Sequence, residues 1–320
     1  MTPRKQLFSA DALSVAPMLD WTDRHFRYFV RLIARRPMLY TEMIACPALI
    51  CGDRDRLLAH HPDERPLTLQ VGGSDPRPMA LCARMAEEYG YDAVDINAGC
   101  PSGRVQAGRF GAVLMQTPEV VADCVAAMRA AAGIPVSVKT RISLADAGGD
   151  GFDALLRFAD AIRRAGCRHI IVHARQARLN LSPEDNRRKL PLNYEAVYRL
   201  KKSFPDMFIT LNGNVLSLAA AREHAAQVDG VMLGRFAYGQ PYALAEADRL
   251  FYGDAHAVPT RAEVLERMLP YLERNRERLP LILSHMMGLF HGRPNAGAYK
   301  RTLMTRDLSA LRDFCRTADG

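Results

Sequence analysis

The chain has 320 residues, 48% of them apolar, and a chain of this length buries about three quarters of its unfolded surface in a sizeable core. Its formal net charge is +8 with the basic residues spread along the chain, which permits a polyanionic partner such as nucleic acid but favours an ordinary solvated surface. Seven cysteines without a C-x-x-C pair or a Cys/His cluster exclude a disulfide or zinc framework, so we expect no metal.

Eight short apolar runs, many of them β-branched, recur along the chain and predict strands. They cover residues 13–18, 38–44, 66–71, 93–97, 135–140, 169–173, 208–212 and 230–234. Amphipathic stretches with helix-capping signals lie between most of them. Strands that alternate with helices in this way favour an α/β fold of the TIM (β/α)8 barrel type over an open sheet. The crossover over residues 45–65 is weakly helical and fits this pattern least well.

The alternation stops near residue 250. Residues 260–290 predict two or more helices, with Thr260 as an N-cap three residues before Glu263. The remaining residues are helical in character and rich in Arg and Lys. We therefore expect a catalytic barrel over residues 1–250 and a small helical domain over residues 251–320.

No apolar run approaches the ~20 residues that a membrane helix needs. The run LSVAPMLD near the N-terminus is too short for a signal peptide. We therefore expect a cytoplasmic protein that has no membrane partner.

In a parallel barrel the catalytic face lies at the C-terminal ends of the strands, so polar residues there carry information. Nearly every predicted strand ends on such a group: Glu42, Gln70, Asn97, Lys139, Arg141, His173, Arg175, Asn212, Asn214 and Arg235. Gln70 offers a donor and an acceptor to an imide-like ring edge. Lys139 could form a Schiff base, donate to an electron-rich ring or pair with a carboxylate. His173 is as easily a satisfied neighbour as a ligand or an acid.

The loops after the last two predicted strands read LNGN and LGR. They place Gly213 and Gly234 where barrels commonly bind phosphate through backbone N–H groups, and Arg235 adds a cationic fork. Asn-Gly is also an ordinary turn signal, but its combination with the second loop favours a phosphate site. The chain has no Walker loop and no G-x-G-x-x-G, so neither a nucleoside triphosphate nor a Rossmann-bound dinucleotide is supported.

Cys100 lies beyond the fourth predicted strand, in a loop opened by Gly99 and stiffened by Pro101. Free cysteine is usually an inert buried side chain, and we expect this of the other six cysteines. A loop cysteine at a barrel mouth, near Arg104 and Arg109, could instead act as a nucleophile or as a proton donor. Spacing alone does not choose between these roles.

Several longer strings occur in a fixed order from about residue 13 to about residue 305: APMLDWTDRHFR, LQVGGSDP, DINAGCPSGRVQAGRFGAVLM, VSVKTRI, IIVHARQA, LSPEDNRR, LNGN and DGVMLGRFAY. Together they resemble the tRNA-dihydrouridine synthases, most closely the A-type. The resemblance implies a TIM barrel with a C-terminal helical domain and tightly bound FMN. It also implies NADPH-driven reduction of the C5=C6 bond of uridines 20 and 20a in the tRNA D loop. The implied partners are tRNA and NADPH, without an obligate protein partner.

The resemblance also assigns roles to the candidate residues. Cys100 matches the general acid that protonates C5 after hydride passes from flavin N5 to C6. The residues that match those meeting the flavin are Pro17, Met18 and Leu19 through their backbone, and Gln70, Lys139 and His173. Those that match the phosphate loops are Asn212, Gly213, Asn214, Gly234 and Arg235. Those that match residues meeting the tRNA are Asn97 at the uridine, Arg187 and Lys300.

Three positions depart from the family pattern. Asn214 stands where a second glycine is more common, so we expect a local difference in the backbone. Gly297 stands where an arginine is common in A-type relatives, and Lys300 where another is common. These departures bear on the tRNA contacts more than on the reaction.

Three other hypotheses remain at this point. A small-molecule reductase of the dihydroorotate or dihydropyrimidine kind would also use FMN in a barrel, but it needs no basic helical tail. A Schiff-base aldolase would use Lys139 and carry no flavin. A non-catalytic tRNA-binding protein would bind tRNA equally well after Cys100→Ala.

Overall fold

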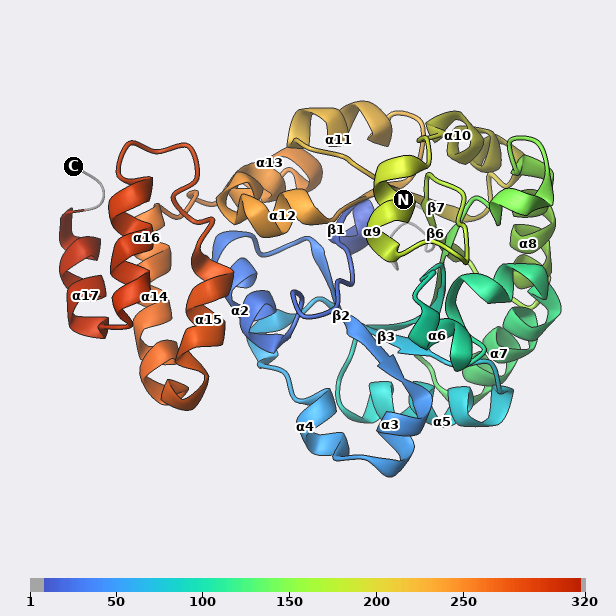
Figure 1. Ribbon diagram of the computed structural model, residues 1–320, viewed down its shortest axis with the longest axis horizontal. Coiled ribbons are helices and arrows are strands. Elements are labelled where there is room, and N and C mark those ends of the chain that lie inside the picture. Colours follow the sequence, from blue (N-terminus) through green and yellow to red (C-terminus); the bar gives the residue numbers. More distant parts are fainter. Residues whose placement is uncertain (1–8, 318–320) are drawn as a thin grey trace.

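The computed structural model describes residues 9–317 and contains a closed barrel of eight parallel strands. The strands pair in chain order, and the ring closes between the first and the last. They are β1 (Leu13–Val15), β2 (Met38–Ala45), β3 (Leu67–Gly72), β4 (Ala93–Ala98), β5 (Val136–Arg141), β6 (His169–His173), β7 (Phe208–Asn212) and β8 (Gly230–Leu233). All eight predicted strands and the TIM-barrel fold are confirmed (Figure 1).

Helices follow the strands and surround the barrel. They are α2 (Arg24–Ile33), α3 (Cys46–Cys51), α4 (Arg54–Leu58), α5 (Pro76–Glu88), α6 (Gly103–Ala107), α7 (Pro118–Ala131), α8 (Phe152–Arg164), α9 (Pro183–Lys189), α10 (Tyr194–Ser203), α11 (Leu218–Ala225), α12 (Arg235–Gly239) and α13 (Ala247–Tyr252). The capping signals explain several starts: Asp75 accepts a hydrogen bond from the N–H of Arg77, and Pro76 occupies the first turn of α5. The weakly helical crossover after β2 holds only the short helices α3 and α4 and a 3₁₀ turn.

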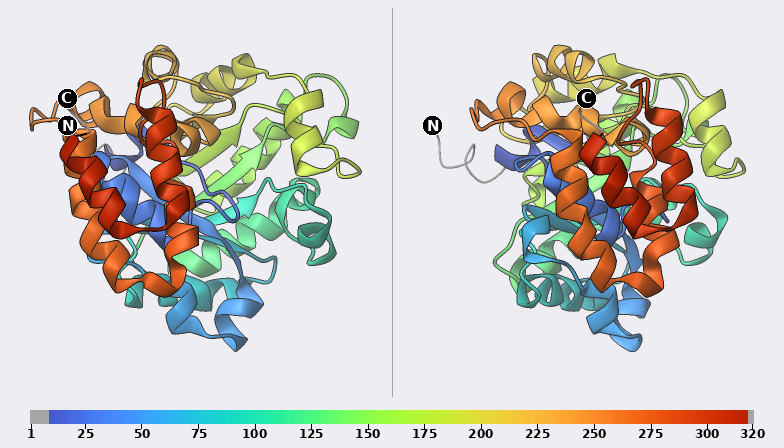
Figure 2. Two further views of the ribbon diagram at one scale, coloured as in Figure 1. Left: turned by 60° about the vertical axis from the view of Figure 1, so that its left-hand side comes forward. Right: turned by 90° about the vertical axis from the view of Figure 1, so that its left-hand side faces the viewer.

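Four further helices follow the barrel: α14 (Arg261–Arg274), α15 (Leu279–Met286), α16 (Ala296–Thr305) and α17 (Leu308–Thr317). The side chain of Thr260 accepts from the N–H of Glu263, and the Glu263 carboxylate accepts from the N–H of Thr260, so the predicted capping box is confirmed. The four helices lie together beside the barrel, with α14 and α15 against α2 (Figures 1 and 2). The boundary expected at residue 250 falls inside α13.

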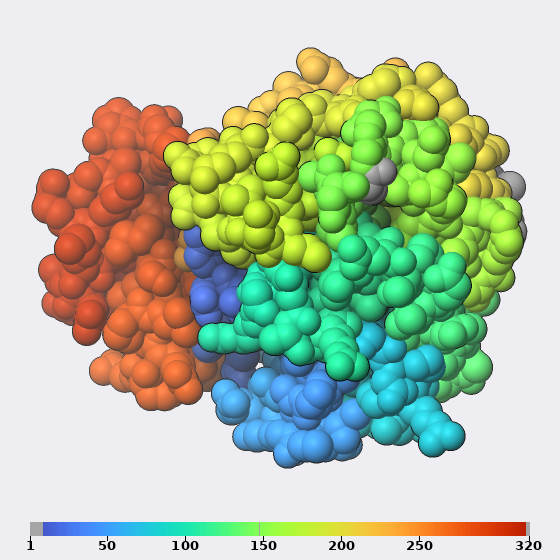
Figure 3. All heavy atoms as spheres, turned by 45° about the vertical axis from the view of Figure 1, so that its right-hand side comes forward, coloured from blue at the N-terminus to red at the C-terminus, as the bar shows by residue number. Residues whose placement is uncertain are grey.

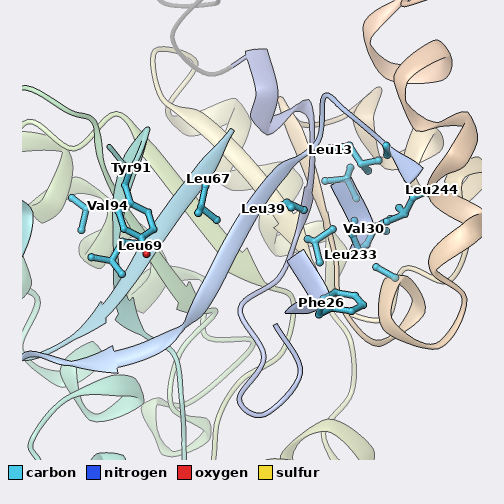
Figure 4. Packing of buried hydrophobic residues seen from close by; sticks show 14 of the residues in the cluster. Leu13, Phe26, Val30, Leu39, Leu67, Leu69, Tyr91, Val94, Leu233 and Leu244 are labelled. Atoms are coloured by element: carbon cyan, nitrogen blue, oxygen red, sulfur yellow. The ribbon is translucent and has the colours of Figure 1, made fainter. Parts of the chain in front are cut away.

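The main hydrophobic core lies between the strands and the surrounding helices. Figure 4 shows part of it, including Phe26 and Val30 of α2 with Leu39 and Leu233 of the strands, all of which are almost fully buried. A second, smaller apolar cluster fills one side of the barrel interior: Ala16, Met38, Tyr40, Ile171 and Met232. The rest of the interior is lined by polar side chains, because the inward positions of β3 to β7 alternate with outward apolar ones.

The N-terminal end of the barrel is closed by the 3₁₀ helix η1 (Ser9–Ala12) and by α13. The buried carboxylate of Asp11 accepts from the hydroxyl of Tyr40 at 3.1 Å and lies 3.8 Å from Nδ1 of His169. Nε2 of His169 lies 2.8 Å from the hydroxyl of Thr210. The hydroxyl of Tyr252 donates to the carbonyls of Ala10 and Leu13. These contacts seal the end of the barrel opposite the catalytic face.

Candidate active site

The inward residues near the C-terminal ends of β3, β4, β5 and β7 converge on the barrel mouth. Gln70, Asn97, Lys139 and Asn212 all take part in its hydrogen bonds, as the strand-end positions predict. Nζ of Lys139 donates to Oδ1 of Asn212 at 3.1 Å, and Nδ2 of Asn212 donates to the carbonyl of Met232 at 2.8 Å. The barrel wall desolvates Lys139 and lowers its pKa to about 8, although the Asp95 carboxylate acts in the opposite direction.

A hydrogen-bonded series runs from a buried carboxylate to the cysteine loop. Nε2 of Gln70 donates to Oδ2 of Asp95 at 2.7 Å, and Nδ2 of Asn97 donates to Oε1 of Gln70 at 2.9 Å. Oδ1 of Asn97 accepts from the backbone N–H groups of Gly99 at 3.2 Å and Cys100 at 3.0 Å. Burial raises the pKa of Asp95 to about 6, against the hydrogen bonds from Gln70 and Ser137, which lower it. This series fixes the loop that carries Cys100.

The Cys100 loop is also held from outside the series. Nε of Arg141 donates to the carbonyl of Gly99 at 2.9 Å, and the N–H of Ala112 donates to the carbonyl of Cys100 at 2.9 Å. Gly111 has φ +76°, and a β-carbon there would lie 2.5 Å from the Cys100 carbonyl oxygen, so only glycine fits. The thiol of Cys100 therefore stands on a rigid, partly exposed loop.

Five of the other six cysteines are buried, as expected of inert side chains. The expectation is wrong for Cys51, which is exposed at the end of α3. The reason is that the short helix α3 ends there at the surface, a feature that its weak sequence pattern did not specify. Cys51 lies at the end of α3, so its exposure does not make it part of the barrel mouth.

The mouth is strongly cationic. Burial holds the pKa of His173 well below its usual range, and nearby positive charges add to the effect: Arg141, Lys139, Arg175 and Arg187. Among residues 9–317, Nδ1 of His173 and Nε of Arg187 are buried without a hydrogen-bond partner. Unpaired polar atoms of this kind are costly unless a ligand satisfies them. The arrangement therefore suits an anionic ligand with acceptor atoms.

Basic residues from distant parts of the sequence lie close enough to Cys100 to interact with it electrostatically. Arg104 and Arg109 are exposed on and just after α6. The cations that interact electrostatically with Cys100 are Arg141, Lys139 and Arg187. Positive charge near the thiol thus includes residues of the neighbouring strand β5 and of α9.

The loop after β7 has two consecutive residues with positive φ. Gly213 has φ +129°, and Asn214 has φ +53°, in the left-handed region that favours glycine and that asparagine tolerates best among the other residues. Asn214 therefore keeps the conformation that a second glycine would give. Asn214 and Arg235 are exposed, while Gly213 is buried.

The loop after β1 is partly committed to its own hydrogen bonds. The N–H of Met18 donates to the hydroxyl of Thr22 at 2.9 Å, and the Met18 carbonyl accepts from the N–H of Thr22 at 3.0 Å. The Met18 side chain packs against the apolar cluster inside the barrel. Pro17 is half-buried, and the side chain of Leu19 is 67% exposed. A ligand at this loop would therefore meet Pro17 and Leu19 rather than the N–H of Met18.

Arg187 and Lys300 lie on different parts of the molecule. Arg187 is on α9, which is anchored by the buried Asn186 through bonds to the carbonyls of Arg178, Leu181 and Ser182. In Figure 3 the yellow-green atoms of the α9 region and the blue-green atoms of the α6 region flank deeper-lying dark-blue atoms from the first part of the described chain. Lys300 is exposed on α16, in the helical region beside the barrel, and no hydrogen bond or ion pair within residues 9–317 links it to the mouth.

The helix that carries Lys300 also contains the departure at Gly297. Nη1 of Arg301 lies 3.5 Å from the position that a β-carbon on Gly297 would occupy. The guanidinium of Arg301 therefore covers the face of α16 from which a side chain at Gly297 would start.

Sequence reasoning missed Asp95 and did not assign Arg141 or Arg175. Asp95 was detectable, since it lies two residues before Asn97 and strand period 2 places both inside the barrel. No comparable signal tells that Arg141 binds the Gly99 carbonyl. In the part of the chain that the structure describes, no helix is long and apolar enough to span a membrane, and no group of His, Cys, Asp and Glu has the arrangement of a metal site.

A closed parallel barrel with a thiol and a ring of buried donors at its mouth is an enzyme scaffold of the TIM type. The chain matches the family model "Dihydrouridine synthase (Dus)" over residues 14–315 and belongs to this family. It is therefore an enzyme, and neither an aldolase nor a non-catalytic RNA-binding protein.

Three relatives define the similarity more closely, and each carries the name tRNA-dihydrouridine(20/20a) synthase. The Synechocystis sp. protein is 49% identical over 94% of this chain and 91% of its own length. The Shewanella oneidensis protein is 49% identical over 91% of this chain and 87% of its own length. The Escherichia coli K12 protein is 48% identical over 91% of this chain and 85% of its own length. The resemblance found in the sequence motifs is thus confirmed for the family.

Proposed function

We propose that this enzyme reduces uridine to 5,6-dihydrouridine at positions 20 and 20a of the tRNA D loop, the activity for which its relatives are named. FMN and NADPH are the proposed cofactor and reductant. The observation that carries the proposal is the hydrogen bond that joins Asn97, near the end of β4, to the loop of Cys100 at a cationic barrel mouth.

The residues of the mouth fit FMN. The orphaned Nδ1 of His173 offers a partner to a heteroaromatic ring edge, and a neutral imidazole at this position adds no further charge. Nζ of Lys139 already donates to Asn212 and has further N–H groups for an electron-rich ring. Gln70 is hydrogen-bonded to both Asp95 and Asn97 inside the barrel. These groups would hold the ring, with Pro17 and Leu19 at the β1 loop.

The loops after β7 and β8 would hold the phosphate of FMN. Gly213 and Gly234 bring the backbone close without side-chain obstruction, and Asn214 keeps its N–H in a left-handed turn. Arg235 starts α12 and supplies a fixed positive charge. In this proposal the ring would be recognised by residues of β3, β5 and β6, and the phosphate by the loops after β7 and β8.

When bound and reduced by NADPH, FMN supplies the hydride that adds to C6 of uracil. Cys100 then donates its thiol proton to C5, which requires the thiol to be protonated when the substrate binds. The Cys100 loop is fixed by Asn97, Arg141 and Ala112, so the thiol needs little reorganisation to reach C5. Asn97 donates to an acceptor of the same base.

The substrate base must leave its stack to reach the barrel mouth, which is easiest in a loop. Basic residues would hold the surrounding RNA through its phosphates: the exposed Arg104, Arg109, Arg178 and Lys300, and the half-buried Arg187. They lie on the rim of the barrel and on α16 beside it. The net charge of +8 agrees with such a role.

The proposal is tested by incubating the purified enzyme with NADPH and unmodified tRNA and mapping dihydrouridine by reverse-transcription stops. We expect a yellow protein, NADPH-dependent product, and stops at positions 20 and 20a, as in the names of the relatives. Modification confined to other uridines would contradict the assigned positions. Reduction of free uracil or uridine, with tRNA unchanged, would establish a small-molecule reductase in its place.

A further inference from the structure

The hydrogen bonds between Asp95 and the Cys100 loop have a fixed direction. Two amide side chains, Gln70 and Asn97, stand in series between a carboxylate and two backbone N–H groups. A carboxylate only accepts, and a backbone N–H only donates. Both ends therefore demand the same orientation of the two amides: each NH2 points toward Asp95, and each oxygen points toward Cys100.

The series is buried at its Asp95 end and rigid at the Cys100 loop. Asp95 is fully buried and Gln70 is 1% exposed. The second carboxylate oxygen of Asp95 accepts from the hydroxyl of Ser137 at 2.7 Å. The backbone N–H of Gln70 donates to the hydroxyl of Thr41 at 3.0 Å. An amide turned the wrong way would place two oxygens together without water to separate them, which is costly inside a protein.

We propose that Asp95, which touches neither Cys100 nor the barrel surface, is a positioning residue that, together with the backbone N–H groups of Gly99 and Cys100, sets the direction of this series and so makes Asn97 a donor toward the substrate. Nδ2 of Asn97 carries two hydrogens, and one of them is donated to Gln70. The other has no partner within residues 9–317, and Asn97 is 9% exposed. Its oxygen is held by Gly99 and Cys100, so a ligand at the mouth meets an N–H.

The direction of the series determines which base fits, and this step depends on the proposed function. A donor at Asn97 pairs with a carbonyl oxygen and is repelled by an amino group. At the ring edge where uracil carries O4, cytosine carries an amino group. The same N–H stabilises the negative charge that develops on the carbonyl oxygen when hydride adds to C6. Asp95 would thus act on substrate choice and rate through two intervening side chains.

Exchanging residues 95 and 97 tests the direction of the series. In Asn97→Asp alone, Gln70 lies between two carboxylates, and both of them can only accept. Its NH2 can donate to one carboxylate, so its side-chain oxygen faces the other. In the double variant Asp95→Asn/Asn97→Asp, Gln70 turns round and its two hydrogen bonds are restored in the opposite direction, while the N–H groups of Gly99 and Cys100 still donate to residue 97. The double variant keeps the composition and net charge but presents a carboxylate to the substrate.

We expect Asn97→Asp to lower the unfolding temperature by on the order of 5 °C at pH 8, where Asp95 is ionised. Asp95→Asn alone should change it little, because the new amide can donate to the Ser137 hydroxyl and accept from Gln70. The double variant should recover most of the loss. With Gln70→Met added to each variant, the recovery should disappear, since residues 95 and 97 interact only through Gln70.

Turnover should not recover with stability. We expect the double variant to retain the visible absorbance of bound flavin but to reduce tRNA on the order of 100-fold more slowly than the unaltered enzyme. Ser137→Ala is the matched control, because it removes a hydrogen bond to Asp95 without changing the direction of the series, and its turnover should stay near that of the unaltered enzyme.

Two results would overturn the inference. If the losses in unfolding temperature of the single variants simply add in the double variant, the two positions are not coupled through Gln70. If turnover recovers together with stability, Asn97 does not act as a donor, and the series is only structural. Should the unaltered enzyme fail to reduce tRNA, the proposed function fails, while the thermal measurements still decide whether Asp95 sets the direction of the series.

Discussion

The two ends of the barrel interior both bury polar side chains, but they treat them differently. At the N-terminal end, Asp11, Tyr40, His169 and Thr210 contact one another, and η1 covers them. At the C-terminal end, His173 lies on the same strand as His169, one inward position beyond Ile171, yet its Nδ1 has no partner within residues 9–317. Both histidines have a pKa lowered by burial.

The comparison shows that a buried polar cluster is not by itself a functional site. In the N-terminal cluster Tyr40 is hydrogen-bonded to Asp11 and His169 to Thr210, so these polar groups contribute to stability. The mouth has an excess of cations and unpaired donors, which lowers the stability of the empty protein and is compensated only by a ligand. Four substitutions separate these two roles.

The largest expected effect concerns the thiols of the two ends. Cys100→Ala should reduce turnover on the order of 1,000-fold while the protein keeps its flavin and binds tRNA, because a proton donor is lost without a change in packing. Cys167 is the control, since its buried thiol donates to the carbonyl of His169 at 3.1 Å and its pKa is raised to about 12. Cys167→Ala should keep full turnover. Single-turnover rates and flavin absorbance measure both; a fully active Cys100→Ala would remove this thiol from the mechanism.

The two histidines of β6 should respond in opposite ways. His169→Leu removes the contacts to Thr210 and Asp11, and we expect it to lower the free energy of unfolding by about 1 to 3 kcal/mol without changing turnover of the folded protein. His173→Leu should leave stability unchanged or higher, weaken flavin retention and slow turnover on the order of 100-fold. Urea unfolding and flavin titration distinguish the pair. If His169→Leu and His173→Leu lowered the free energy of unfolding equally, the two ends of the barrel would not differ in this way.

The third prediction concerns the pH dependence of stability. The pKa of Lys139 is lowered from 10.5 to about 8 in the folded protein, first by burial. Between these values the unfolded chain holds a proton that the folded chain has lost, so this residue makes stability rise with pH from about 8 to 10.5. Relative to Lys139→Met, the unaltered protein should gain at most about 3 kcal/mol over this window. Urea unfolding at pH 7.5 and pH 9.5 measures the difference, and a constant offset would contradict it.

The smallest effect is expected in the loop after β7. Asn214 has φ +53°, so Asn214→Gly should change stability by less than about 0.5 kcal/mol and leave flavin retention intact. Asn214→Ala, which lacks the tolerance of asparagine for this region, should cost about 1 kcal/mol. A large loss of flavin in Asn214→Gly would show that the asparagine side chain itself holds the ligand.

The fold was predictable because each strand carries its own apolar pattern and each helix its own capping signals. Where the pattern is weak, over residues 45–65, the structure has only short helices. The strand-end residues Gln70, Asn97 and Lys139 were also predictable, since parallel strands bring their C-terminal ends together.

The contacts of the site were less predictable. Arg104 and Arg109 are close to Cys100 in sequence, but Arg141 of the next strand holds its loop. The direction of the hydrogen bonds through Gln70 depends on what both of its neighbours can donate or accept, which a single residue does not reveal. Which side chains contact each other across strands is therefore determined by the closed barrel and not by the local sequence.

Closure of that barrel has a consequence for how the chain folds. The three residues of β1 pair with β8, and the hydroxyl of Tyr252 contacts Leu13 across 239 positions of sequence. During synthesis the first strand has no partner on one side until nearly the whole barrel has left the ribosome. Contacts this distant in sequence slow folding. The polar interior, with Lys139 and Asp95 inside it, thus stays open to water until β8, the last strand to be synthesised, closes the ring.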